Sequence, residues 1–396
     1  MLRLAARGDG VTDDGRHIAL AAPGDHVAKD GTVEPGPHHV TPPCRHFSRC
    51  GGCQLQHVDD DTYATYLTDR INGALAAQQL PLPVTRAPHL SPPHARRRAS
   101  LRAERIGRRV VIGFNEGASH RIVDMRECHV LRPELFALVE PLRALLRPHL
   151  RDRKPVGVRM TLGDQGVDLA LEGITFEGLE GSEALTDFAG SHHLARLSLD
   201  EGYGPEPRWE PEPVTITLGG IAVPLPAGAF LQATEDGEAA LLAAVREIVG
   251  QAATVADLFA GLGTFALPIG ADARVLAVEG ARDAALALKT AANRSGRPVL
   301  IEHRDLFRRP LDRAELNRFE AIVLDPPRAG AKEQAPALAT AEVARIAYVS
   351  CNPATFARDA RTLIEGGWTL EWIRPIGQFR WTTHVELVAA FNRPGA

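Results

Sequence analysis

The chain has 396 residues, too many for one ordinary core and suited to two or three domains. Its 44% apolar and 24% charged content is typical of globular proteins and excludes a wholly disordered, collagen-like or coiled-coil chain. The net charge of -4 gives no global attraction for nucleic acid, so such binding requires a local basic patch. Charged residues interrupt the first ten positions, so we expect a cytoplasmic protein with reduced thiols, no signal peptide and no membrane segment.

The first part of the chain predicts a small β segment followed by a helix. Residues 1–40 alternate apolar and polar positions around Asp14-Gly15 and Pro23-Gly24, a pattern of short strands and turns. Residues 59–80 predict a helix, because acidic residues at its start interact well with the helix dipole.

The next part predicts antiparallel strands. Alternating patterns occupy residues 94–128, with a turn near Gly107, and residues 155–200. The Pro- and Glu-rich segment 202–213 is typical of a linker or long loop. We therefore expect a central domain over residues 41–213, after a short first unit.

From residue 214 the pattern changes, because short apolar strands now alternate with Ala- and Arg-rich helical segments. This alternation predicts an α/β unit over 214–396, with a mainly parallel sheet covered on both faces. Ligands of such sheets bind beyond the carboxyl ends of the strands. Those predicted ends carry Asp257, Glu279, Asp305, Asp325 and Cys351. We expect the functional site at this rim.

A glycine-rich turn follows the first strand of that unit. The segment Asp257-Leu-Phe259-Ala-Gly261-Leu-Gly263 joins a strand to a helix, and glycines let the backbone approach a ligand there. Glu279 ends the next strand, where a carboxylate suits the hydroxyls of a ribose. The spacing also fits a dinucleotide fingerprint, so NAD remains an alternative ligand.

Two further motifs end strands of the same unit. Asp325-Pro-Pro-Arg328 predicts a rigid, extended rim that could hold a flat ring, although a simple strand terminator is the alternative. Cys351 lies between a strand and a helix that starts near Pro353. A helix N-terminus lowers the pKa of a thiol and favours a nucleophile, and a buried inert cysteine is the alternative.

The other four cysteines predict a metal centre. Three are closely spaced and the fourth is distant: Cys44, Cys50, Cys53 and Cys128. Thiolates at such spacing bind an iron–sulfur cluster or zinc. We favour the cluster because zinc usually takes its ligands as two close pairs. We expect the loss of a ligand to unfold this region more than it alters the distant catalytic rim.

Seven arginines lie between residues 96 and 109. On strands, several of their guanidinium groups would share one face and suit phosphates. The candidates for RNA contacts are Arg96, Arg97, Arg98 and Arg102. A solvated basic face is the alternative.

Together these motifs resemble the RNA uracil-5-methyltransferases that use S-adenosylmethionine, over roughly residues 44–396. The segments that carry the resemblance are CRHFSRCGGCQLQH (44–57), GFNEGASHRIVDMREC (113–128), AGAFLQAT (227–234), DLFAGLGTF (257–265), DPPRAG (325–330), SCNPATFARD (350–359) and HVELVAAF (384–391). Within the family, the cysteine segment is similar to that of the bacterial 23S ribosomal RNA enzymes that hold a [4Fe-4S] cluster.

The resemblance implies a class I, Rossmann-like methyltransferase domain with a mainly parallel seven-stranded sheet behind a β-rich iron–sulfur domain. It implies Cys351 as the nucleophile and Glu386 as the general base. It also implies S-adenosylmethionine as the methyl donor and a [4Fe-4S] cluster on the four cysteines. The candidate cofactor-binding residues are Gln232, Asp257, Phe259, Gly261, Gly263, Glu279, Asp305 and Asp325.

The chain departs from the family pattern at three places. Residues 1–40 resemble the start of a TRAM domain, a small RNA-binding barrel, but are too few to complete one. Gly377-Gln-Phe-Arg380 stands where the family has Asp-x-Phe-Pro, and Thr234 stands where Asn is frequent.

We expect a monomer that methylates C5 of one uridine in RNA, most simply 23S rRNA, with tRNA as the alternative. The chemistry agrees, because C5 of uracil is a poor nucleophile until a thiolate adds to C6, and a base must then remove the C5 proton. An NAD-dependent iron–sulfur oxidoreductase and a non-catalytic RNA-binding protein are the alternatives from other classes.

Overall fold

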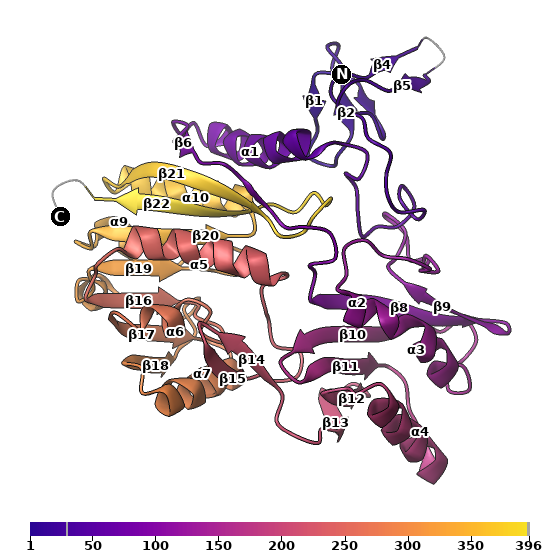
Figure 1. The fold of residues 1–396 in the computed structure, drawn as a ribbon. Helices are drawn as coiled ribbons and strands as arrows, with labels where there is room; N and C mark the ends of the chain where they lie inside the picture. The colour runs from indigo at the N-terminus through magenta and orange to yellow at the C-terminus, as the bar shows by residue number, and fades with distance from the viewer. Residues whose placement is uncertain (29–30, 394–396) are drawn as a thin grey trace.

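The computed structural model describes residues 1–28 and 31–393, arranged as a small N-terminal unit, a central sheet and a large C-terminal sheet (Figure 1). The N-terminal unit has two antiparallel sheets, which confirms the short strands predicted there. They are β1 (Arg3–Leu4), β2 (Gly10–Val11) and β3 (His17–Ile18) in one sheet, and β4 (His26–Val27) and β5 (Val33–Glu34) in the other. Among the described residues, no helix combines the length and the apolar character needed to cross a membrane.

The predicted helix after the cysteine segment is α1 (Asp60–Ala77). Asp59 caps it, since its carboxylate accepts a hydrogen bond of 2.8 Å from the Thr62 amide. Although α1 precedes the central sheet in sequence, it packs against α10 (Pro353–Glu365) and β21 (Thr369–Gly377), as Figure 1 shows. The N-terminal part of the chain therefore contributes to the C-terminal unit.

The central unit is a six-stranded sheet with helices on one face. In spatial order its strands are β13 (Pro205–Trp209), β12 (Arg196–Asp200), β11 (Gly166–Glu172), β10 (Val156–Gly163), β8 (Arg98–Ile106) and β9 (Arg109–Gly113). Its helices are α2 (Pro133–Ala137), α3 (Val139–Leu146) and α4 (Gly178–Ser191). Their apolar side chains share one core with the sheet, and along β8 buried and exposed residues alternate.

Two details of the central unit differ from the sequence prediction. Residues 155–200 are not simply antiparallel, because α4 lies between β11 and β12 and makes that pair parallel. The segment 202–213 is not only a linker, since β13 pairs antiparallel with β12 as an edge strand. Its two prolines are compatible with an edge position, where a missing N–H is tolerated.

The C-terminal sheet has nine strands, and its central part is parallel as predicted. In spatial order the strands are β18 (Val299–His303), β17 (Arg274–Glu279), β16 (Thr254–Leu258), β19 (Ala321–Leu324), β20 (Arg345–Ser350), β22 (Glu386–Asn392), β21 and β6 (Val84–Thr85), with β7 (His89–Leu90) also paired to β21. The first five are parallel, and β22 is antiparallel to both of its neighbours. The seven expected strands are present, and β6 and β7 add two short ones from the N-terminal half of the chain.

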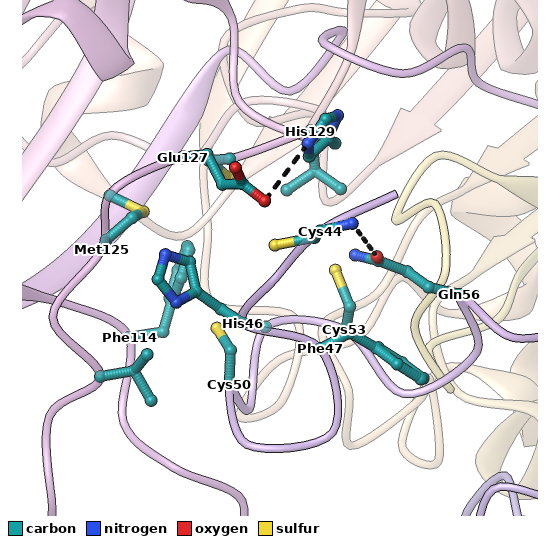
Figure 2. Close-up of a pocket in the computed structure, with 14 residues that line it drawn as sticks. Cys44, His46, Phe47, Cys50, Cys53, Gln56, Phe114, Met125, Glu127 and His129 are labelled. Atoms are coloured by element: carbon teal, nitrogen blue, oxygen red, sulfur yellow. Dashed lines mark hydrogen bonds and ion pairs between the residues drawn. The ribbon is translucent and has the colours of Figure 1, made fainter. Parts of the chain in front are cut away.

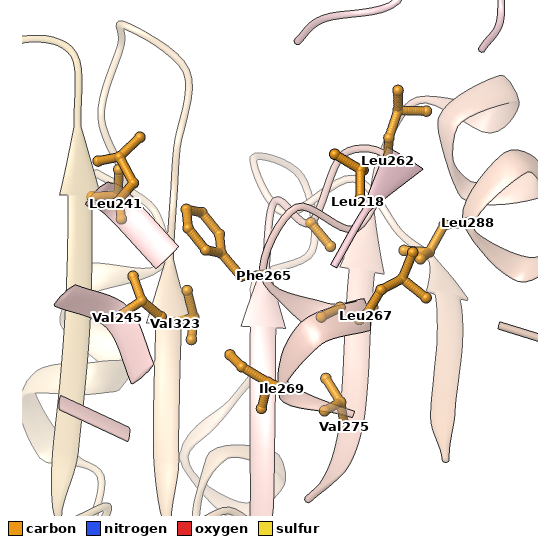
Figure 3. Packing of buried hydrophobic residues seen from close by; sticks show 14 of the residues in the cluster. Leu218, Leu241, Val245, Leu262, Phe265, Leu267, Ile269, Val275, Leu288 and Val323 are labelled. Atoms are coloured by element: carbon orange, nitrogen blue, oxygen red, sulfur yellow. The ribbon is translucent and has the colours of Figure 1, made fainter. Parts of the chain in front are cut away.

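Both faces of this sheet are covered, and each has its own apolar core. One core is formed with α5 (Glu235–Val249), α6 (Ala266–Ile269), α7 (Arg282–Ser295) and the hairpin of β14 (Thr215–Leu218) and β15 (Ile221–Pro224); Figure 3 shows part of it. The other is formed with α1, α8 (Arg313–Leu316), α9 (Ala335–Thr340) and α10. Successive strand residues alternate between the cores, as Val323 and Leu324 do, because side chains of a strand point to opposite faces.

Candidate active site

A cavity of about 610 Å³ opens at the carboxyl ends of the parallel strands, where the sequence predicted a site. Its walls come from the loop before α5, the glycine turn after β16, the segment after β19 and the segment after β20. Seven of the predicted residues line it: Gln232, Phe259, Gly261, Glu279, Asp325, Cys351 and Glu386. The fold thus brings the proposed nucleophile, the proposed base and most of the proposed cofactor residues into one space.

The glycine turn has a backbone that favours glycine. Gly261 has a φ of 57° and Gly263 a φ of 95°, both in the left-handed region. Phe259 shares that region with a φ of 65°, which places strain beside the cavity. The Gly261 amide donates to Oε2 of Glu279 at 2.7 Å, and the Ala281 amide donates to Oε1 at 2.6 Å. Glu279 therefore fixes the shape of the turn as well as lining the cavity.

Three of the predicted cofactor residues do not line this cavity: Asp257, Gly263 and Asp305. Asp257 is fully buried, and in the described part of the chain neither of its carboxylate oxygens has a hydrogen-bond partner. Burial raises its pKa well above the ordinary value, with Asp325 adding to the effect. Asp305 accepts a 2.9 Å hydrogen bond from the Phe307 amide and shapes the loop after β18.

Cys351 follows β20 and lies one residue before Asn352, the N-cap of α10. Oδ1 of Asn352 accepts a hydrogen bond of 3.1 Å from the backbone amide of Ala354. Nδ2 of the same side chain donates to the Arg328 carbonyl at 3.0 Å. The prediction of a lowered thiol pKa is wrong for the ligand-free chain. Burial, together with the nearby carboxylates of Glu386 and Asp325, raises the pKa of Cys351 to about 11.

Two carboxyl groups of the cavity also have raised pKa values. Burial raises the pKa of Asp325, at the end of β19, to about 7. Burial and the charge of Asp325 raise the pKa of Glu386, the first residue of β22, to about 8. A side chain with such a pKa can accept and release a proton near neutral pH, which is the property of a general acid or base.

Gln378 is a buried residue of the site that the sequence argument did not select. Its Nε2 group donates to Oε1 of Gln232 at 2.7 Å and to Oε2 of Glu386. The only signal in the sequence is its place in the segment Gly377-Gln-Phe-Arg380, where the chain departs from the family pattern. Arg328 also lines the cavity without having been selected, although it belongs to the Asp-Pro-Pro-Arg motif.

The four predicted metal ligands line one small cavity between the N-terminal unit and the central sheet. Figure 2 shows the sulfur atoms of Cys44, Cys50 and Cys53 directed toward the same space. Burial raises the pKa of all four thiols, that of Cys53 to about 12, and Cys128 adds to the effect on the other three. Within residues 1–28 and 31–393, no group of three or more His, Cys, Asp or Glu side chains is arranged to hold a metal ion.

The cysteine segment contacts the loop between β21 and β22, residues 378–385, which we call the catalytic loop because it leads into Glu386. The amides of Gln54 and Leu55, next to Cys53, donate to the Trp381 carbonyl at 2.8 and 2.9 Å. The Tyr63 hydroxyl donates to two further carbonyls of the loop between β21 and β22. This loop leads straight into Glu386.

The four arginines selected as RNA contacts have different surroundings. Arg97 is 1% exposed, and its guanidinium donates to Glu238 at 2.5 Å and to the Gln232 carbonyl at 3.0 Å, so it holds α5 to the central sheet. Arg96 is half-buried against the rings of Phe114 and Phe379. Arg98 and Arg102 lie four residues apart on the face of β8 opposite the helices. A shared basic face therefore includes Arg98 and Arg102 but not Arg97.

Comparison with known proteins agrees with this site. Residues 224–393 match the family model described as tRNA (Uracil-5-)-methyltransferase. An uncharacterized RNA methyltransferase of Zymomonas mobilis is 54% identical over 99% of each chain. A 23S rRNA (uracil(1939)-C(5))-methyltransferase of Thiobacillus denitrificans is 33% identical over 91% of this chain and 87% of that protein.

The same fold occurs in the crystal structure of Pyrococcus abyssi tRNA (uracil-54, C5)-methyltransferase in complex with S-adenosyl-L-homocysteine. That structure has a TM-score of 0.74 and 21% identity, with 99% of each chain covered. The fold is therefore that of a class I methyltransferase. The relatives, the fold and the cavity together show that this chain is a member of the RNA uracil-C5 methyltransferase family, an S-adenosylmethionine-dependent enzyme.

Proposed function

We propose that this enzyme methylates C5 of one uridine in 23S ribosomal RNA. The observation that carries the reaction is the single cavity that Cys351, Glu386 and Asp325 share with the glycine turn. The choice of ribosomal RNA rests on the 33% identity to a 23S rRNA enzyme over nearly the whole chain. Transfer RNA is the alternative, and the tRNA enzyme of similar structure supports only the fold at 21% identity.

The residues of the cavity supply what the reaction needs. The Cys351 thiolate adds to C6 of the uracil, which makes C5 an enolate carbon. S-adenosylmethionine supplies the methyl group that C5 receives. Glu386 then takes the proton from C5, the C5–C6 double bond reforms, and the C6–S bond breaks to return the thiolate. Apolar walls around the cavity, including Phe259 and Phe265, exclude water from these steps.

Two substitutions test this division of roles. Cys351→Ala is expected to form no adduct and to have no activity, since no other group adds to C6. Glu386→Gln is expected to accumulate a denaturation-resistant protein–RNA adduct that already carries the methyl group, because elimination stalls. The measurement is a denaturing gel with methyl-labelled cofactor and 23S rRNA from a strain that lacks this gene. Wild-type turnover by Glu386→Gln without a trapped adduct would falsify the base assignment.

The choice of RNA has its own test. Mapping of 5-methyluridine in ribosomal and transfer RNA of a strain without the gene should show one missing site in 23S rRNA. A missing site in tRNA alone would replace the ribosomal assignment and leave the chemistry unchanged.

We propose in addition that the four cysteines hold a [4Fe-4S] cluster in the domain expected over residues 41–213, from which α1, β6 and β7 are set apart because they join the C-terminal unit. The donor set fits, since the four thiols line one cavity, which His46, Glu127 and His129 also line. The spacing along the chain, three close cysteines and one distant one, favours the cluster, because zinc usually takes its ligands as two close pairs.

We also propose that RNA lies on the open face of the central sheet and reaches the catalytic cavity past Phe230. Arg98 and Arg102 supply positive charge on this face. Phe230 is 63% exposed, lines the cavity and has the Arg98 guanidinium 4.7 Å from its ring centre. Exposed aromatic rings beside basic groups are typical of surfaces that bind unpaired nucleotides.

A further inference from the structure

All the hydrogen-bonding groups of the Gln378 side-chain amide have partners. Gln378 follows β21 and is 1% exposed. Its Oε1 accepts from the amides of Ala233 at 2.8 Å and Thr234 at 3.4 Å. Its Nε2 donates to Oε1 of Gln232 at 2.7 Å and to Oε2 of Glu386. A glutamine amide has two N–H groups and two acceptor lone pairs, so no capacity remains.

These partners leave one orientation for the amide. Two backbone N–H groups face one end of the Gln378 side chain, and they can only donate. Two side-chain oxygens face the other end, one of them from Glu386. Turning the amide over would set its N–H groups against the two backbone N–H groups, so these backbone groups determine that an N–H group faces the Glu386 carboxylate.

The first turn of α5 leaves room for the Gln378 side chain. A Cβ atom at Gly237 would lie 2.7 Å from Cβ of Gln378, closer than real side chains approach. Gly237 has an ordinary helical backbone, so the glycine serves close approach and not an unusual φ. Helix α5 and β21 therefore hold the Gln378 side chain between them.

We propose that Gln378 is the positioning residue for the general base: its N–H holds Oε2 of Glu386 and directs the other carboxylate oxygen to the C5 proton of the substrate. This inference rests on the proposed function, since it assigns Glu386 as the base. An amide suits the task because it neither takes up nor releases a proton in this pH range. A buried hydrogen bond to a charged group is also among the stronger ones, and it holds a single geometry.

Three other groups around Glu386 affect its charge. Asp325 at the end of β19 opposes ionisation, and Arg98 at the start of β8 favours it. The Cys351 thiol after β20 lies near enough for Glu386 to raise its pKa. Gln378 acts in the same direction as Arg98, since its hydrogen bond lowers the pKa of Glu386. Removal of the amide should therefore raise the pH at which the base becomes active.

The test is Gln378→Met, which keeps the length of the side chain and removes the donor. Adduct formation and methyl transfer should remain near the wild-type rate, whereas release of the methylated RNA should slow about 10- to 100-fold. The midpoint of the pH profile of release should rise by about one to two pH units. The measurement is a single-turnover quench with methyl-labelled cofactor and 23S rRNA from the deletion strain, from pH 6 to pH 10.

Gln334→Met is the matched control. Gln334 is fully buried, does not line the cavity and exchanges two hydrogen bonds with the backbone of Leu311, at 2.8 and 2.9 Å. Gln334→Met removes a buried side-chain amide of the same kind. It therefore shows how much of any effect comes from a loss of protein stability alone. It should leave the pH midpoint of release where the wild type has it.

The outcomes separate this inference from the function on which it rests. If the wild type forms no covalent adduct, the proposed function fails. If Glu386→Gln traps the adduct but Gln378→Met releases product at the wild-type rate and midpoint, Gln378 has no positioning role. Equal slowing of methyl transfer and release, with the midpoint unchanged, would also overturn the inference, because that pattern indicates a structural residue.

Discussion

Substitution of Tyr63 by Phe should loosen the catalytic loop without touching the cavity. The Tyr63 ring is fully buried in α1, and its hydroxyl donates to the carbonyls of Phe379 at 3.1 Å and Thr382 at 3.3 Å. In Tyr63→Phe the Phe379 carbonyl would keep two hydrogen bonds, because the Thr382 amide and hydroxyl both donate to it, at 3.0 and 2.8 Å. Only the Thr382 carbonyl would be left unpaired.

One unpaired buried carbonyl costs about 1 to 2 kcal/mol, the lower part of the range for such groups. The ring itself stays, so no cavity forms. Local opening of the loop should therefore become about 5 to 30 times more frequent. Hydrogen exchange followed by mass spectrometry measures this as faster exchange in peptides that cover residues 379–385, and product release should slow because the loop leads into Glu386.

Tyr66→Phe is the control on the same helix. Tyr66 is also buried, it stacks on Tyr63, and its hydroxyl donates to the Ala6 carbonyl at 2.9 Å. Its loss should speed exchange near residue 6 and leave the catalytic loop as it was. Equal protection of residues 379–385 in Tyr63→Phe and in the wild type would refute the reasoning. Equally fast exchange of these residues in Tyr63→Phe and in Tyr66→Phe would also refute it.

Two further predictions concern the proposed cluster and RNA surface. Protein purified without oxygen should be brown and contain iron and sulfide, and Cys128→Ser should lose both and exchange faster at the catalytic loop; stoichiometric zinc without iron would contradict the cluster. Arg102→Gln should weaken RNA binding and reduce the slope of log affinity against log salt by about one, with cofactor binding as the unchanged control. An unaltered salt slope would mark Arg102 as a solvated surface residue.

The sequence predicted the parts of the fold that depend on local pattern. Alternating apolar strands and helices were enough to predict the parallel sheet, and the residues at its strand ends identified Asp325 and Cys351 as neighbours. Pattern could not predict that β6 and β7 join β21, because strands of two residues carry no periodicity. Pattern also could not predict the contact between the cysteine segment and Trp381, because its hydrogen bonds come from the backbone amides of Gln54 and Leu55.

The pKa of Cys351 and the surroundings of Arg97 could not be predicted from the sequence for a different reason. The start of α10 suggested a lowered pKa for Cys351, but burial beside two carboxyl groups outweighs a helix dipole. Likewise, Arg97 belongs to a basic run, yet its side chain turns inward to Glu238. Whether a charged group faces solvent or a partner depends on tertiary packing, which single-residue patterns do not contain.

The raised pKa values imply that binding of the methyl donor depends on pH. S-adenosylmethionine carries a positive sulfonium, and a positive charge favours the ionised forms of Asp325 and Glu386, whose pKa values are about 7 and about 8 without it. Because these groups are neutral at pH 6 and lose protons toward pH 8, affinity for the cation should rise over that interval. If binding lowers the pKa of Asp325 by one unit, linkage gives a rise of about fivefold.

S-adenosylhomocysteine is the matched ligand for this prediction, because it lacks the methyl group and the sulfonium charge. Calorimetric titration of both ligands from pH 6 to pH 8 should show a steeper rise for S-adenosylmethionine, and Glu386→Gln should reduce the difference. The two ligands share their other ionisable groups, so titration of the ligand itself contributes little to the comparison below pH 7. Parallel pH profiles for the two ligands would mean that the buried carboxyl groups do not sense the reacting sulfur, and the electrostatic account of this cavity would then be wrong.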